Sequence, residues 1–194
     1  MRIILAFGVL LLSSPVNAAC DTSQYNLIYM QKAYNEFNSD PNKQTAFVFF
    51  NSIPSTFCEF NEIYGWRRDN PGPLYELQLH GTLENLSDYI DADELALKYV
   101  SLASEGQWDA DNIGALHDAY RTHLINNPRY VVVKVMLLPK HKRKNAMAFL
   151  FNIFHPSADV LDEGEKKEVC AISVQFCEEL SLVEKELLAE EEHH

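Results

Sequence analysis

Glycine is scarce in this sequence, with 7 residues among 194. The chain contains neither the glycine-rich loops that hold nucleotide phosphates nor the G-x-S-x-G turn that carries the nucleophilic serine of α/β-hydrolases. The histidines also lack the H-x-x-x-H and H-E-x-x-H spacings that bind zinc from one helix. The sequence therefore offers no motif for these enzyme classes, and we expect neither a cofactor nor a metal ion.

Basic residues are in the minority. The chain has 16 lysines and arginines against 28 aspartates and glutamates, which gives a formal net charge of -12. A protein that binds nucleic acid in general needs positive charge to attract the phosphates. The balance therefore excludes that class, whereas an acidic surface keeps a protein soluble and attracts cationic partners.

Long apolar runs are also missing, except at the N-terminus. Residues 3–12 form a short apolar run behind Arg2, and Ser13, Ser14, Pro15 and the small residues of 16–19 follow. This run is too short to cross a bilayer, which takes about 20 residues. The pattern predicts a cleaved export signal over residues 1–19, with a buried core helix as the alternative. We expect no transmembrane segment in the mature chain.

Four cysteines remain after cleavage: Cys20, Cys58, Cys170 and Cys177. In an oxidising compartment an even number predicts two disulfides, and three pairings are possible. On one continuous helix, Cys170 and Cys177 would lie about 10 Å apart, so they can pair only if the chain turns between them. Cys20 lies at the cleavage point, so the alternative for this residue is a lipid anchor, although Asn17 matches a lipoprotein signal poorly.

Apolar residues recur with a helical period along the rest of the chain. The predicted helices cover residues 21–38, 41–51, 54–64, 74–86, 91–102, 109–126, 128–138, a segment around 146–153, and parts of 165–192. Residues 128–138 contain four valines, which favour a strand, but Pro128 and Pro139 frame the segment as a helix. We favour the helix and keep the strand as the alternative.

The connections between these helices are short. Short connections and a lack of repeats predict an all-α, single-domain helical bundle or a short helical-hairpin stack. We expect about eight helices within residues 20–194, followed by a frayed acidic tail at the C-terminus.

Two patterns approach a metal site and fail. Glu76 and His80 are four residues apart on a predicted helix, but the local sequence supplies no third and fourth ligand. The stretch from Asp109 begins like a calcium loop, but Tyr120 stands at position twelve, where a glutamate is required. We therefore interpret Asp109 as a helix cap.

One basic island stands out in the acidic chain. It holds Lys140, His141, Lys142, Arg143 and Lys144. Such a cluster can dock an anionic partner, and its alternative role is a solvated first helical turn. Positive charge is mildly unfavourable near a helix N-terminus, which makes the docking role more interesting.

A second candidate surface follows the aromatic residues of 47–66. Trp66, Arg67 and Arg68 lie in a stretch whose composition predicts a loop. Tryptophan and arginine are favoured at the centres of protein interfaces. These three residues are therefore candidate binding residues, whereas the aromatic residues before them are expected to form core.

The stretches 49–57 (FFNSIPSTF), 59–65 (EFNEIYG), 73–75 (PLY) and 151–156 (FNIFHP) resemble a group of small secreted or periplasmic helical bacterial proteins without an assigned activity. The resemblance implies a bacterial envelope setting and carries over no functional residue. We expect an exported, periplasmic, non-enzymatic protein-binding module, in one version an immunity-type inhibitor of an envelope-targeted toxin. The alternative is a cell-wall hydrolase, which needs two carboxyls, or a histidine and a carboxylate, in mutual reach.

Overall fold

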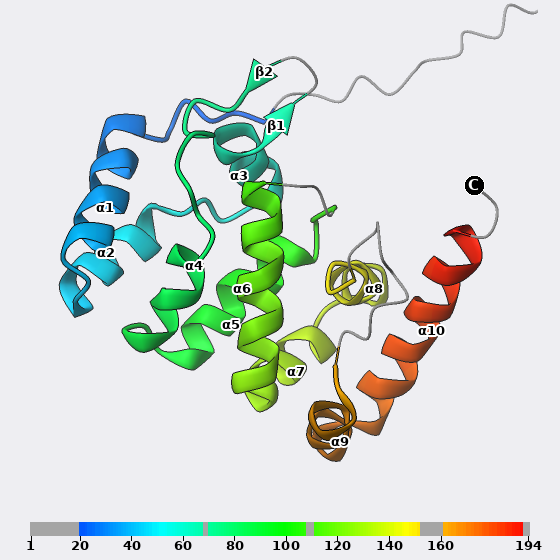
Figure 1. Ribbon diagram of the computed structural model, residues 1–194. Helices are drawn as coiled ribbons and strands as arrows, with labels where there is room; N and C mark the ends of the chain where they lie inside the picture. The colour runs from blue at the N-terminus through cyan, green and yellow to red at the C-terminus, as the bar shows by residue number, and fades with distance from the viewer. Residues whose placement is uncertain (1–19, 68–69, 108–110, 152–160, 192–194) are drawn as a thin grey trace, which may run out of the picture.

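The computed structural model describes residues 20–67, 70–107, 111–151 and 161–191 (Figure 1). The described residues form ten α-helices, one 3-10 helix and one small hairpin, so the all-α single-domain prediction is confirmed, and the estimate of about eight helices was too low. The predicted export signal lies outside the described residues. In the described part of the chain, no helix is both long enough and apolar enough to cross a membrane.

The elements follow one another in a simple order. The helices are α1 (Leu27–Ser39), α2 (Lys43–Ser52), α3 (Phe57–Tyr64), α4 (Thr82–Asn85), η1 (Leu86–Asp88), α5 (Ala92–Ala103), α6 (Asn112–Asn126), α7 (Pro128–Met136), α8 (Lys140–Ala148), α9 (Glu163–Ile172) and α10 (Val174–Glu191). The hairpin between α3 and α4 pairs β1 (Trp66–Arg67) with β2 (Asn70–Pro71) in antiparallel orientation. Helix α10 continues to Glu191, so it includes the first residues of the predicted acidic tail.

Side-chain caps decide where the first three helices begin. Asn26 caps α1, Asn42 caps α2, and Thr56 with Glu59 forms a capping box at α3. These side chains satisfy backbone amides that have no partner inside the helix. The predicted starts at residues 21, 41 and 54 were therefore too early, and Asp40 is not the cap of α2.

Helix α6 occupies the middle of the fold and contacts α4, α5 and α7 (Figure 1). Its predicted apolar stripe is buried, including Ile113, Leu116, Tyr120 and Leu124. The next segment is helical as favoured, and it buries Val131, Val132 and Val135. The free energy gained by burying these valines in the core is larger than the modest preference of valine for strands, so the segment is a helix.

The predicted helix over residues 74–86 was wrong. Only α4 and Leu86, the first residue of η1, are helical there, and hydrogen bonds from the buried side chain of Asn112 hold the preceding chain in a non-helical path. The Asn112 amide donates to the carbonyls of Tyr64 (3.0 Å) and Tyr75 (2.8 Å), and its oxygen accepts from the Leu79 amide (3.2 Å). A turn at Gly81, with φ of 75°, then starts α4.

Two disulfides select one of the three possible pairings. Cys20 pairs with Cys58 at a Cα separation of 6.0 Å, and Cys170 pairs with Cys177 at 5.5 Å. The second pair meets the condition set by the sequence, because Ser173 is extended (φ -152°) and separates α9 from α10. The chain therefore turns between the two cysteines.

Candidate functional site

Two neighbouring hollows of the described surface lie beside α2 and α5. One of about 430 Å³ is lined by Lys43, Phe47, Asp88, Tyr89, Ile90, Asp91 and Glu94. Its neighbour of about 490 Å³ is lined by Phe50, Ser55, Glu94, Leu97, Lys98 and Ser101. Glu94 lines both, so we treat them as one feature and call it the α2–α5 groove. Two other hollows are about 30 and 10 Å³, enough for a water molecule or two.

Large apolar side chains line the α2–α5 groove, and two of them are exposed. Phe47 is 54% exposed and Leu97 is 58% exposed, while Phe50 and Ile90 are buried at 8% each. The buried pair belongs to the core cluster. The exposed pair presents apolar area to solvent next to it, and such area beside a concave surface is typical of a contact site.

One face of α5 supplies a wall of the groove. Glu94, Leu97, Lys98 and Ser101 are related by steps of three, four and seven residues, so they lie along the same side of the helix. The capping aspartate Asp91 fixes the start of α5, because its side chain accepts from the Asp93 amide at 2.8 Å. The wall is therefore rigid helix rather than loop.

Lys98 connects this wall to the end of α2. Its Nζ donates to the Ile53 carbonyl at 2.9 Å and lies 5.2 Å from the centre of the Phe50 ring. Burial lowers the pKa of the Lys98 ammonium below its ordinary value. The hydrogen bond and the cation–π contact offset part of the free-energy cost of burying the charge. Lys98 therefore links α5 to the end of α2 across the groove.

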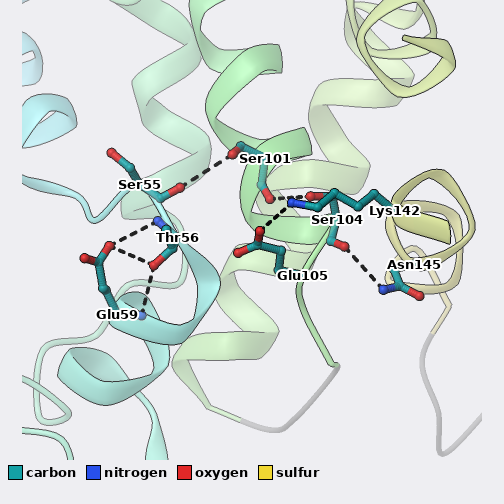
Figure 2. A network of polar contacts seen from close by, with 8 residues as sticks. All are labelled: Ser55, Thr56, Glu59, Ser101, Ser104, Glu105, Lys142 and Asn145. Carbon is teal, nitrogen blue, oxygen red and sulfur yellow. Dashed lines mark hydrogen bonds and ion pairs between the residues drawn. The ribbon is translucent and has the colours of Figure 1, made fainter. Parts of the chain in front are cut away.

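A polar network links α5 to its neighbours from Ser101, the last groove residue on this helix, onward (Figure 2). Ser101 Oγ donates to the Ser55 carbonyl at 3.5 Å, which brings α5 close to the start of α3. Lys142 Nζ lies 2.6 Å from Glu105 Oε1, and Asn145 donates to the Ser104 carbonyl at 3.4 Å. These contacts join α5 to the start of α3 and to α8.

The basic island of the sequence faces acidic side chains of the same chain. Besides the Lys142–Glu105 pair, Arg143 forms a two-pronged ion pair with Glu179, and Lys144 pairs with Glu186. The two glutamates come from α10, so the island joins α8 to the C-terminal hairpin. Lys140 and His141 are exposed at the start of α8. Binding of an anionic partner by this island remains a prediction.

The Arg143–Glu179 pair should make the stability depend on pH. Burial alone would raise the pKa of the Glu179 carboxyl, but hydrogen bonds from Gln175 and Arg143, together with the Arg143 charge, hold it below its usual value of 4.5. A lowered carboxyl pKa stabilises the fold above about pH 4.5, and this contribution is lost as the pH falls through the folded-state pKa. Arg143→Met should therefore lower the free energy of unfolding by about 2 kcal/mol at pH 7.

Urea unfolding between pH 3 and pH 7 checks this prediction. The difference between wild type and Arg143→Met should shrink as the pH falls below about 4.5. Lys144→Met is the matched control, because Lys144 and Glu186 are both more than half exposed, and exposed pairs contribute little. Equal losses from the two substitutions would contradict the assignment.

The other predicted surface lies on the small hairpin. Trp66 is 48% exposed, and its ring packs edge-on against Tyr75 at 5.2 Å. Arg67 lies in β1, whereas Arg68 falls outside the described residues. Neither Trp66 nor Arg67 lines the α2–α5 groove, so the structure separates this candidate from the groove.

A cluster of titratable side chains lies between α4 and α6. His80 Nδ1 is 3.5 Å from one oxygen of Asp118, and His117 Nδ1 is 3.1 Å from the other. Burial raises the pKa of the neighbouring Glu84 carboxyl, and the charge of Asp118 adds to this effect. Glu76 and His80 do not share a helix, so their predicted relation was wrong. Among the described residues, no group of His, Cys, Asp or Glu side chains is placed to hold a metal ion.

The sequence predicts Phe47 in the core and gives no signal for Leu97 or Lys98 as groove residues. The signal for Phe47 is the run of four apolar residues from 47 to 50 on one helix. Four consecutive positions cover more than one face, so at least one of them has to face away from the core. Comparisons with protein-family models, curated proteins and solved structures find no match to the chain.

Proposed function

We propose that the chain is an exported, non-enzymatic protein-binding module whose partner docks in the α2–α5 groove. The exposure of Phe47 and Leu97 on a groove with rigid helical walls carries this proposal. Interface energy concentrates in a few apolar anchors that lose water on binding. In its specific version, the protein is an immunity-type inhibitor that binds a toxin delivered to the bacterial envelope.

Periplasmic location is part of the proposal. It is supported by the export signal that the sequence predicts over residues 1–19 and by the pairing of all four cysteines after it. A lipid anchor at Cys20 would need the same sulfur atom that pairs with Cys58. We therefore propose a free periplasmic protein rather than a tethered one.

Charge placed on the groove tests the binding function. Phe47→Glu and Leu97→Glu should each reduce capture of the partner from an envelope extract of the source cells by about 30-fold or more, because an apolar anchor is lost and a charge is buried. Leu137→Glu is the matched control, since Leu137 is 77% exposed and lies beyond the end of α7, outside the groove. Quantitative mass spectrometry of the captured proteins gives the readout. If all three variants capture the same proteins equally well, the groove is not the binding site.

A cell-wall hydrolase is the second candidate, and the cluster at Asp118 favours it. A glycosidase needs one carboxyl with a raised pKa as the acid and a second, ionised carboxyl. Burial raises the pKa of the Glu84 carboxyl, and Asp118 supplies a second carboxyl in the same cluster, with His80 beside it. The candidate predicts loss of turbidity of purified peptidoglycan, and abolition of this activity by Glu84→Gln or Asp118→Asn. Failure of the wild type to act on peptidoglycan would remove this candidate.

A further inference from the structure

The two ends of the α2–α5 groove differ in charge. At the end near η1, Asp88, Asp91 and Glu94 line the groove together with Ile90, and Lys43 is the cation of that lining. None of the three carboxylates forms an ion pair with a described residue, although Asp91 accepts the capping hydrogen bond from an amide of α5. Asp88 and Glu94 are exposed, so the rim of this end is acidic and open to a cationic partner.

The groove has the length of a short helix. Its lining along α5 runs from the capping residue Asp91 to Ser101, which are ten residues apart and therefore about 15 Å apart along the helix axis. A docked helix of about three turns covers this length. Such a helix presents anchors at steps of three, four and seven residues, which is the usual pattern of helix-in-groove recognition.

The backbone around the groove offers little to an extended peptide. An extended segment needs a strand edge whose amides and carbonyls can pair with its own. Here both walls are helices, and the carbonyls of Ile53 and Ser55 already accept from Lys98 and Ser101. A helix satisfies its own backbone hydrogen bonds, so it can lie on Phe47, Phe50 and Leu97 without leaving amides unpaired.

We infer that the occupant of the α2–α5 groove is a short amphipathic helix of a partner protein, with lysine or arginine on its flank facing Asp88 and Glu94. This inference rests on the proposed binding function and specifies its partner. Complementary charge at the rim sets the specificity and the association rate, while the apolar anchors supply most of the affinity. The net charge of -12 strengthens the attraction to a cationic segment.

Three labelled peptides of about 14 residues test the inference by fluorescence anisotropy with the mature protein. The first is an amphipathic helix with lysines on its polar face, the second carries glutamates there, and the third is a scramble of the first without helical spacing. We expect the first peptide to bind at least tenfold more tightly than the scramble, and the second not to bind. Equal binding of the first peptide and the scramble would show charge attraction alone and would overturn the inference.

Charge-reversal variants locate the binding. Asp88→Lys combined with Glu94→Lys should weaken binding of the lysine peptide at least tenfold and should allow the glutamate peptide to bind. Glu168→Lys combined with Glu178→Lys changes the net charge equally on α9 and α10, which Figure 1 shows well apart from α2, and should have a much smaller effect. Equal effects of the two pairs would overturn the inference. The proposed function fails separately, if Leu97→Glu leaves capture of the cellular partner unchanged.

Discussion

Replacing Asn112 by alanine should lower the free energy of unfolding by about 3–5 kcal/mol, because three backbone groups lose their partner together. Asn112 is 4% exposed. Its side chain donates to the carbonyls of Tyr64 and Tyr75 and accepts from the Leu79 amide. An unpaired buried backbone group costs about 1–3 kcal/mol, and water has little access to replace the lost hydrogen bonds.

Asn112→Asp should be similarly damaging, which separates hydrogen bonding from packing. A carboxylate has nearly the shape of the amide, but it offers no donor to the carbonyls of Tyr64 and Tyr75. Asn35→Ala is the control, because Asn35 is exposed on α1, and we expect a change within about 0.5 kcal/mol. Urea unfolding gives the free energies, and hydrogen exchange at Leu79 should accelerate in both Asn112 variants. A loss below about 1 kcal/mol in Asn112→Ala would contradict the proposed role.

The same side chain explains why one prediction from the sequence failed. Residues 74–86 have a composition that suits a helix, and local propensity predicts one. Asn112 lies 33 residues after Leu79 and 48 residues after Tyr64, and its hydrogen bonds hold the intervening segment in a non-helical path. Local rules cannot anticipate a bond across that distance. They do well for α6, whose apolar stripe needs only its own spacing to be recognised.

The groove was beyond the reach of sequence reasoning for a related reason. Periodicity shows that Phe47 shares a helix with other apolar residues, but it does not show that no neighbouring helix covers it. The basic island illustrates the opposite case. Its charges are obvious in the sequence, whereas Glu105 and Glu179, which pair with Lys142 and Arg143, lie 37 and 36 residues away. The exposure of Phe47 and the ion pairs of the basic island both depend on which helices pack next to each other.

Removal of the two disulfides should have unequal effects. Cys20 and Cys58 are separated by 38 residues, and Cys170 and Cys177 by 7. A disulfide lowers the entropy of the unfolded chain, and this effect grows with the length of the loop that it closes. It stabilises the fold by about 4 kcal/mol for the first bridge and about 2 kcal/mol for the second. In a chain of this size, the first loss lowers the melting temperature by roughly 10 °C.

Contacts next to the Cys20–Cys58 bridge in the folded protein support this estimate. Tyr25 Oη donates to Glu59 at 2.9 Å, and Gln24 donates to the same carboxylate at 2.7 Å, so the segment after Cys20 lies on α3. These contacts keep the N-terminal segment ordered and let the bridge act mainly on the unfolded state. The paired variants are Cys20→Ser with Cys58→Ser, and Cys170→Ser with Cys177→Ser. Urea unfolding should rank the first pair as the more destabilised, and the reverse ranking would contradict the entropy argument.

Reduction of both disulfides in the wild type also tests the proposed periplasmic location. The two bridges lie in different parts of the fold, so their contributions should add to about 6 kcal/mol. That is a large share of the 5–15 kcal/mol that typically stabilises a domain. The protein with residues 1–19 removed should therefore lose much of its stability in a reducing cytoplasm and recover it when exported or oxidised. Intact mass of the exported protein measures the bridges as a loss of about four daltons, whereas a lipid on Cys20 would add several hundred. A fully stable reduced protein would remove the main physical reason to place it in an oxidising compartment.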